Sequence, residues 1–220
     1  MGRSFPRNAA AGLVVIVGLA ACSGGAGTPA GARAVLTPAA VAAADSGRPA
    51  YTAADVAFMS GMIGHHAQAV LMAGWAPTHG ASAAVRALSE RIVVGQQDEI
   101  ALMQSWLRER REPVPDGDVS HFMMPGMDHT RLMPGMLTPA QLAQLNAARG
   151  PEFDRLFLTF MIQHHEGAIA MVEKLFGSSG AAQDDNVFKL ASDVHVDQIT
   201  EIERMSLMLA ELGSPTGKRP

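Results

Sequence analysis

The chain has 220 residues, of which 48% are hydrophobic and 17% charged, with a net charge of −4 and one cysteine. One cysteine excludes an internal disulfide framework and a cysteine-based metal cluster. No basic patch indicates binding to nucleic acid.

The N-terminus has the pattern of a secretory signal. Two arginines precede an apolar run at 9–21, which is shorter than the roughly 20 residues that a membrane-spanning helix needs. The run ends in Leu19-Ala20-Ala21-Cys22, which resembles a bacterial lipobox. We therefore expect residues 1–21 to be a signal peptide of lipoprotein type and Cys22 to be lipidated. Loss of the signal removes the two arginines, so the net charge would change from −4 to −6.

Residues 22–50 are expected to be a lipid anchor and flexible tether, because they are rich in Gly, Ala, Ser, Thr and Pro. We expect residues 51–212 to form one domain and 213–220 to be a tail. Ala, Leu and Met dominate over Val and Ile, and no long segment alternates like a strand. The fold class is therefore predicted to be all-α.

The first helix is predicted to start near Thr52 and to end before Pro77. Ser82 is a suitable N-cap for the second helix, which Pro113 and Pro115 would stop. These signals predict two consecutive helices, which we expect to form an αα-hairpin.

A long connector rich in Pro and Gly follows at 112–137. Thr138 and Pro139 open a short helix to about residue 148, with Pro at the favoured first position. Two further long helices are predicted at about 151–176 and 187–212, separated by a short loop.

A motif occurs twice, ninety-nine residues apart: Met-Ile-x-His-His at 62–66 returns at 161–165. Gln-x-x-Glu-Ile-x-x-Met at 96–103 likewise returns at 198–205. One hairpin buries its apolar face poorly, but two duplicated hairpins can form a four-helix bundle. The two repeats are residues 52–110 and 151–212.

The histidine pairs are predicted to face inward. On a helical wheel with about 100° per residue and Met62 as zero, His65 lies near −60° and His66 near +40°, on either side of the core-facing stripe. The third long helix repeats this arrangement with His164 and His165. Four polar residues are expected at one inner edge, where they could fix the tautomers of ligating histidines or simply satisfy buried ones: Gln96, Glu99, Gln198 and Glu201.

Imidazole and thioether groups suit a soft or borderline transition metal, whereas each methionine taken alone is an ordinary core residue. The motifs of di-iron bundles, zinc proteases and attached haem (Glu-x-x-His, His-Glu-x-x-His and Cys-x-x-Cys-His) do not occur. The connector is either a thioether-rich metal loop or an adaptable apolar cover. Its potential ligands include Met123, Met124, Met127 and His129.

The pattern Asp-x-x-Phe-(x)3-Met-Ile-x-His-His-x-x-Ala, followed by Gln-x-x-Glu-Ile-x-x-Met, resembles the domain-of-unknown-function family 305. The connector run 133–138 and the segment 150–154 resemble it too, so the resemblance covers about 51–212. It implies an exported, ferritin-like four-helix bundle that is often associated with copper. By position, it implies these metal groups: His65, His66, His164, His165, Met62, Met72, Met161 and Met171.

The leading hypothesis is an extracytoplasmic, membrane-anchored lipoprotein that sequesters, buffers or transfers copper, with Cu(I) favoured and Cu(II) possible. A copper-handling protein is a possible partner. Two alternatives remain: a metal-dependent oxidase or peroxide-handling bundle enzyme, and a metal-free helical envelope module whose histidines are core polar groups. The sequence sets no oligomeric state.

Overall fold

The structure, a computed structural model, describes residues 51–117 and 132–213. Within these ranges the chain is all-α, as predicted, and no helix is long and apolar enough to cross a membrane. The predictions for the signal peptide, Cys22, the tether and the tail beyond residue 213 lie outside the described residues, as do Met123, Met124, Met127 and His129. The helices are α2 (Ala53–Gly74), α3 (Ala83–Glu109), α4 (Pro139–Ala147), α5 (Pro151–Phe176) and α6 (Asp185–Gly213).

Local sequence signals start these helices. Thr52 and Thr138 cap α2 and α4 through capping boxes, and the Ser82 hydroxyl accepts from the first turn of α3. α6 begins two residues before the predicted Val187, because the carboxylate of Asp184 accepts from the backbone N–H of Val187 at 3.3 Å. An N-cap aspartate in this loop was the signal that the sequence reading missed.

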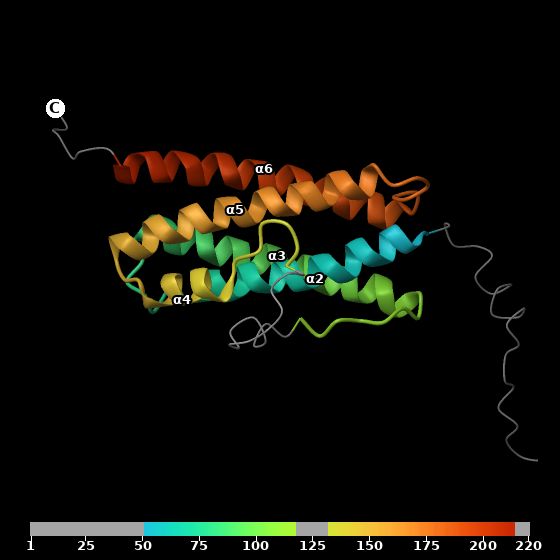
Figure 1. Cartoon of the computed structure of the whole chain (residues 1–220), viewed down its shortest axis with the longest axis horizontal. Coiled ribbons are helices and arrows are strands. Elements are labelled where there is room, and N and C mark those ends of the chain that lie inside the picture. Colours follow the sequence, from blue (N-terminus) through green and yellow to red (C-terminus); the bar gives the residue numbers. More distant parts are fainter. Residues whose placement is uncertain (1–50, 118–131, 214–220) are drawn as a thin grey trace, which may run out of the picture. The chain divides into compact units, whose positions relative to one another are not determined.

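The four long helices form the predicted bundle (Figure 1). α2 packs against α3, and α5 against α6, so each repeat is a hairpin; α2 also packs against α5. α3 and α6 pack less closely against each other, while the short α4 lies on α5 and α2. The bundle therefore has one closely covered side, at α2 and α5, and one looser side, at α3 and α6.

A buried aspartate at the start of each hairpin holds the turn of the other hairpin. The Asp55 carboxylate on α2 accepts from the backbone N–H of Ala182, in the loop between α5 and α6, at 2.7 Å. The Asp154 carboxylate on α5 accepts from the backbone N–H of Ser82, in the loop between α2 and α3, at 3.2 Å. Asp-x-x-Phe thus recurs in both repeats because each copy fixes the partner hairpin.

A layer of polar side chains divides the apolar core. One core cluster includes Met72, Leu88 and Phe157, and the other includes Met59, Met103 and Val187. On every long helix the polar residues come between positions of the first and the second cluster. We call them the central layer: His65, His66, Gln96, Glu99, His164, His165, Gln198 and Glu201.

The described end of the connector, residues 132–137, crosses the α2/α5 side and is called the strap here (Figure 1). The side chain of Gln68 bonds Leu137 twice, accepting from its N–H at 2.7 Å and donating to its carbonyl oxygen at 3.1 Å. A Cβ atom at Gly167 would lie 2.0 Å from the carbonyl oxygen of Pro134. The strap therefore lies directly on the backbone of α5.

Replacement of Gly167 by alanine should displace the strap, because the added methyl group has no space. We expect a loss of about 1–3 kcal/mol in the free energy of unfolding, measured by urea denaturation. Gly95→Ala is the control: it lies inside α3 with no atom within 4 Å of the added Cβ, and should stabilise the helix by about 0.5–1 kcal/mol. Equal effects of the two substitutions would contradict the close approach.

Candidate metal site

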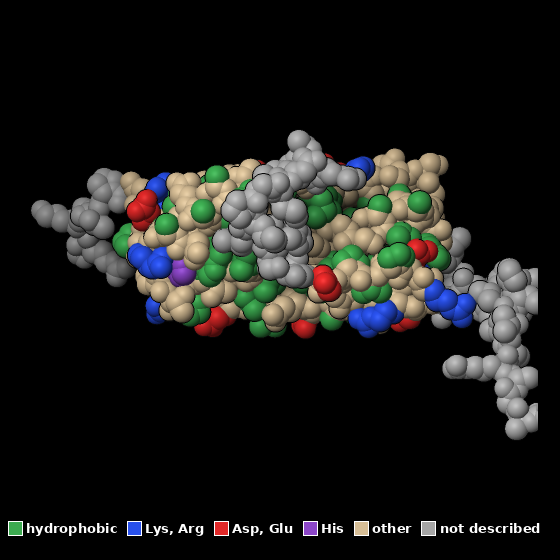
Figure 2. Space-filling model, turned by 60° about the horizontal axis from the view of Figure 1, so that its bottom comes forward, with side chains coloured by type: hydrophobic (Ala, Val, Ile, Leu, Met, Phe, Trp, Pro, Cys, Tyr) green, Lys and Arg blue, Asp and Glu red, His purple; other side chains and the backbone are tan. Residues whose placement is uncertain are grey.

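The four histidines of the repeated motif lie inside the bundle, as the helical wheel predicted. α2 carries His65 and His66, and α5 carries His164 and His165; each has 0% exposure. Almost no histidine is visible on the face shown in Figure 2. The motif achieves this because positions three and four residues after an inward methionine share its side of a helix.

The histidines form an inner pair and two outer residues. The rings of His65 and His164 lie against each other across the α2/α5 contact, with centroids 3.8 Å apart and planes at 41°. His66 Nε2 donates to the Glu99 carboxylate at 2.7 Å. His165 Nε2 donates to the Glu201 carboxylate at 2.8 Å. The two repeats thus supply equivalent halves of one arrangement.

The hydrogen bonds leave ring nitrogens without partners. His65 Nε2 donates to the carbonyl oxygen of Pro134 in the strap at 2.9 Å. The Nδ1 atoms of His65, His66 and His165 have no hydrogen-bond partner, and His164 has none at either nitrogen. In a neutral imidazole that donates from Nε2, the lone pair lies at Nδ1, and this is the atom that can bind a metal.

Burial also keeps the inner pair uncharged. Burial, helped by the neighbouring His66, lowers the pKa of His65 from 6.5 to about 3. Burial and the proximity of His65 lower the pKa of His164 well below 6.5. Both rings are therefore neutral at neutral pH, and a proton does not compete for their lone pairs there.

His79 shows what a purely structural histidine looks like in the same protein. It is buried in the turn after α2, outside the central layer, with 6% exposure. Its Nε2 contacts the carbonyl oxygen of Asn146 at 2.9 Å, and its Nδ1 contacts the Thr78 hydroxyl at 3.0 Å. Both nitrogens of His79 are satisfied, unlike those of the four central histidines.

The predicted methionines divide into two groups. Met62 and Met161 are fully buried, one helical turn before the histidines. Met72 is buried about two turns, roughly 10 Å, beyond His65 in one core cluster. Met171 is half-buried and packs against the other cluster. Met62 and Met161 thus lie beside the central layer, whereas Met72 and Met171 lie farther away, at different core clusters.

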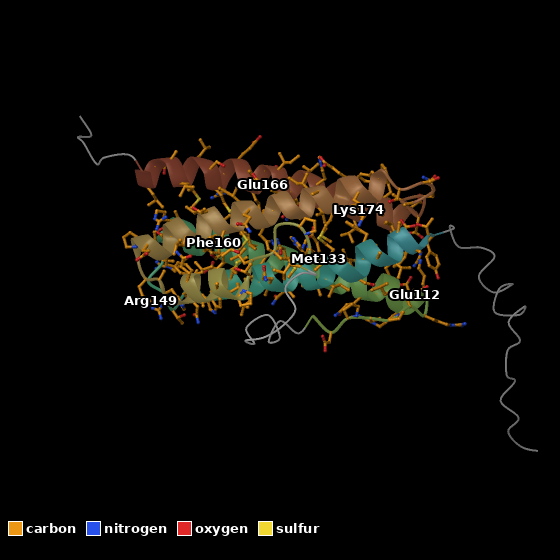
Figure 3. The ribbon with its side chains drawn as sticks, in the orientation of Figure 1. Glu112, Met133, Arg149, Phe160, Glu166 and Lys174 are labelled. Atoms are coloured by element: carbon orange, nitrogen blue, oxygen red, sulfur yellow. The ribbon has the colours of Figure 1, made fainter. Side chains whose placement is uncertain are left out.

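The strap provides groups that sequence reasoning did not select as site residues. The carbonyl oxygen of Pro134 binds His65, and Gln68 holds Leu137. Met133 lies over the middle of the bundle (Figure 3), and a Cβ at Gly61 would lie 3.1 Å from its Sδ and 3.5 Å from Met171 Cε. Only the abundance of Met, Pro and Gly in the connector hinted at these contacts.

Two of the four predicted polar residues bind histidines: Glu99 and Glu201 accept from the outer pair. Gln96 and Gln198 are buried as expected, but both amide atoms of Gln96 and the amide oxygen of Gln198 have no hydrogen-bond partner. In the ranges 51–117 and 132–213, no three His, Cys, Asp or Glu side chains stand close enough to hold a metal ion together. The donors offered are therefore imidazole pairs with neighbouring thioethers, a set that suits a soft ion such as Cu(I).

The model of the family "Domain of unknown function (DUF305)" matches residues 55–209. A solved structure of a candidate secreted DUF305 protein from Streptomyces coelicolor is similar: identity is 28%, the match covers 76% of this chain and 98% of that one, and the TM-score is 0.62. No curated protein sequence matches significantly.

Two structures of a protein called CopM are also similar to this chain. In its Cu(II)-bound form the identity is 28%, with 71% of this chain and 96% of that chain covered and a TM-score of 0.57. In its Cu(I)-bound form the identity is 26%, with 75% and 100% covered and a TM-score of 0.55. The relatives thus include a protein that has been crystallised with copper in both oxidation states.

The metal-free protein should lose stability in acid before most carboxylates titrate. The folded state disfavours protonation of His65 and His164, whereas the unfolded chain protonates them near pH 6.5. Stability is therefore full above about pH 6.5 and falls toward about pH 3, by up to about 1.4 kcal/mol per pH unit for each group. Urea unfolding with a chelator present measures this slope.

The double variant His65→Gln/His164→Gln should show a flatter dependence between about pH 6.5 and pH 5. His79→Gln is the control for the loss of a buried histidine outside the central layer. If the double variant retained the full slope, the inner pair would not be its source.

Proposed function

The chain belongs to the DUF305 family, and from this membership and the central layer we propose that it is a copper-binding protein of the cell envelope. It would sequester copper, buffer it or pass it on. The observation that carries this proposal is the inner pair: two neutral, fully buried imidazoles in contact, with ring nitrogens that no protein group satisfies. Such nitrogens are costly to bury unless a ligand uses them.

The proposed ligands are the inner histidines, His65 and His164, with thioethers from Met62 and Met161. The outer histidines would join through Nδ1, with Nε2 held by a glutamate. A carboxylate on the far nitrogen of a ligating imidazole fixes its tautomer and increases its basicity. Met72 and Met171 remain proposed ligands of second rank, since they lie outside the layer.

Copper is favoured over other metals by the donor types. Thioethers are soft ligands that select Cu(I), and imidazole accepts both oxidation states, while no cysteine is available for zinc after lipidation of Cys22. The similarity to CopM, crystallised with Cu(I) and with Cu(II), supports the same choice.

The location belongs to the proposal as well. Residues 1–21 would direct export, Cys22 would carry the lipid, and 22–50 would tether the domain 51–212 to the membrane. The similar protein from Streptomyces coelicolor is a candidate secreted protein. The Met/His-rich part of the connector would then capture copper or exchange it with a copper-handling partner; its proposed ligands are Met123, Met124, Met127 and His129.

The first test is copper binding by protein that lacks residues 1–22. We expect tight binding, and we expect the loss of most of it when His65, His66, His164 and His165 are replaced by alanine. His79→Ala is the matched control, because it removes a buried histidine whose nitrogens are satisfied; it should retain copper. The measurement is metal analysis after equilibrium dialysis, with circular dichroism to verify folding.

Full copper stoichiometry and affinity in the folded quadruple variant would contradict the site. If no metal were recovered with the native protein and none bound on titration, the metal-free helical module would be the better description. Oxygen-dependent turnover of Cu(I) to Cu(II) that the quadruple variant lacks would instead favour the oxidase.

The second test separates the oxidation states. Met62→Leu/Met161→Leu removes two thioethers and keeps the apolar volume, so the fold should remain stable. The affinity for Cu(I), measured by competition with a chromophoric chelator, should fall by about tenfold or more, and that for Cu(II) should change much less. Met59→Leu, in the core on the same helix, is the control. Equal effects on both oxidation states would argue against thioether ligation.

A further inference from the structure

A metal ion needs a path to the central layer, because all four histidines have 0% exposure. The strap and α4 cover the α2/α5 side, where Gly167 lies against Pro134. On the other side, α3 and α6 leave a cavity of about 200 Å³ at the level of the layer. We call it the α3/α6 groove. Its polar lining consists of Arg91, Gln96, Glu99, Asp197, Gln198, Thr200 and Glu201.

Two buried amide side chains that line this groove have polar atoms without hydrogen-bond partners. Gln96 and Gln198 have 3% and 2% exposure. Neither the oxygen nor the nitrogen of the Gln96 amide has a hydrogen-bond partner, and neither does the oxygen of Gln198. Buried amide groups are normally satisfied, so two equivalent unsatisfied glutamines indicate a polar ligand in the groove.

The groove is also negatively charged. Three carboxylates line it against one guanidinium, that of Arg91, which is 53% exposed and reaches Glu201 at 4.0 Å. Burial, together with the charges of Glu99 and Glu201, raises the pKa of Asp197 despite Arg91. One guanidinium therefore compensates the negative charge of the groove only in part.

Two glutamates that line the groove also bind the outer histidines. Glu99 and Glu201 bind His66 and His165 through one oxygen each, while the residues remain 14% and 12% exposed. A cation in the groove would thus be separated from each outer imidazole by one carboxylate.

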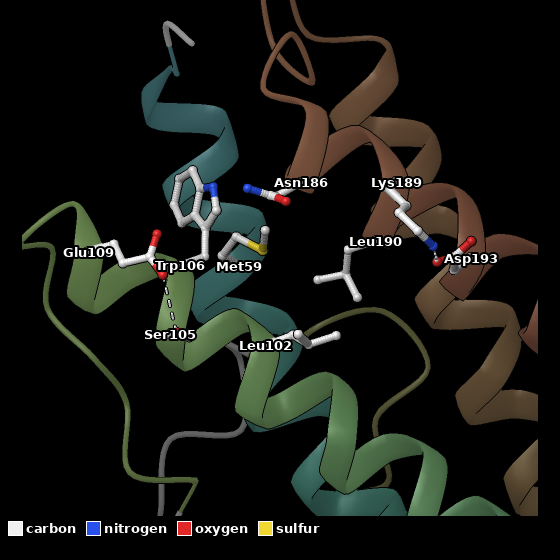
Figure 4. A pocket seen from close by; sticks show the side chains of 9 residues that line it. All are labelled: Met59, Leu102, Ser105, Trp106, Glu109, Asn186, Lys189, Leu190 and Asp193. Atoms are coloured by element: carbon white, nitrogen blue, oxygen red, sulfur yellow. Dashed lines mark hydrogen bonds and ion pairs between the residues drawn. The ribbon is translucent and has the colours of Figure 1, made fainter. Parts of the chain in front are cut away.

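The neighbouring cavity between α3 and α6 has a different character. It is lined by Met59, Trp106 and Leu190 among others, and its Lys189 and Asp193 pair with each other (Figure 4). It offers apolar surface and paired charges. Of these two cavities, the groove at the central layer is therefore the one that suits a cation.

We propose that the α3/α6 groove binds a hydrated divalent metal cation and is the port through which copper reaches the buried histidines. The cation site is independent of the proposed function, whereas the port for copper rests on it. The carboxylates do not converge closely enough for three of them to bind one ion directly. The cation therefore keeps water molecules, to which the carboxylates and the amide oxygens of Gln96 and Gln198 bind.

The cation site can be tested with Mn²⁺, which prefers carboxylate, carbonyl and water oxygens. In NMR titrations, Mn²⁺ should first broaden the side-chain amide signals of Gln96 and Gln198, before those of Gln68 under the strap. Asp197→Asn should raise the apparent Kd by roughly threefold or more, because it removes a charge from the groove. The control is Glu166→Gln, an exposed carboxylate on α5 (Figure 3). Broadening without this preference, or unchanged by Asp197→Asn, would overturn the cation site.

The port can be tested by the rate of Cu²⁺ loading, followed by stopped-flow tryptophan fluorescence. Asp197→Asn should slow loading by roughly threefold at low salt, with unchanged stoichiometry and less salt dependence, whereas Glu166→Gln should load like the wild type. Equal loading rates in all three proteins would overturn the port and leave the proposed function intact. If the wild type bound no copper, the proposed function would fail, while the Mn²⁺ result would still decide the cation site.

Discussion

The four imidazoles at the centre of the bundle are buried away from bulk solvent, so the protein must supply their hydrogen-bond partners. Glu99 and Glu201 meet this constraint for the outer histidines, and the carbonyl oxygen of Pro134 meets it for His65. Neither ring nitrogen of His164 has a hydrogen-bond partner. An unsatisfied buried polar group costs about 1–3 kcal/mol. The layer is therefore better suited to holding a ligand than to stabilising the empty bundle.

The duplication creates this layer, and the residues that differ between the two repeats determine how the layer is covered. The position of Gln68 in the first repeat is occupied by Gly167 in the second. Gln68 binds the strap, and Gly167 makes room for it, so one strap covers both repeats. Asp197 likewise corresponds to Gly95, which places a single extra carboxylate on the looser side. An exact repeat would have neither the one-sided cover nor this charge.

Local patterns predicted most of the fold and half of the site. Thr52 and Ser82 revealed helix starts because capping depends on residues within one turn. The spacing of His66 and Glu99 from their neighbours predicted that both face inward. The contact of His65 with Pro134 was not predictable, because the connector has no periodicity and its path depends on distant packing. The repeated Asp-x-x-Phe pattern likewise did not reveal that Asp55 holds Ala182 across the bundle.

The charge of the site bears on the oxidation state of the proposed cargo. The inner donors, His65, His164 and the adjacent thioethers, are all neutral, and the carboxylates of Glu99 and Glu201 bind the outer histidines instead. Moving a divalent ion from water into such surroundings is more costly than moving a monovalent one. The inner pair therefore suits Cu(I), whereas the carboxylate-lined groove suits a hydrated divalent ion. If copper arrives as Cu²⁺, reduction would have to accompany its passage from the groove to the inner pair, and an external reductant must then provide the electron.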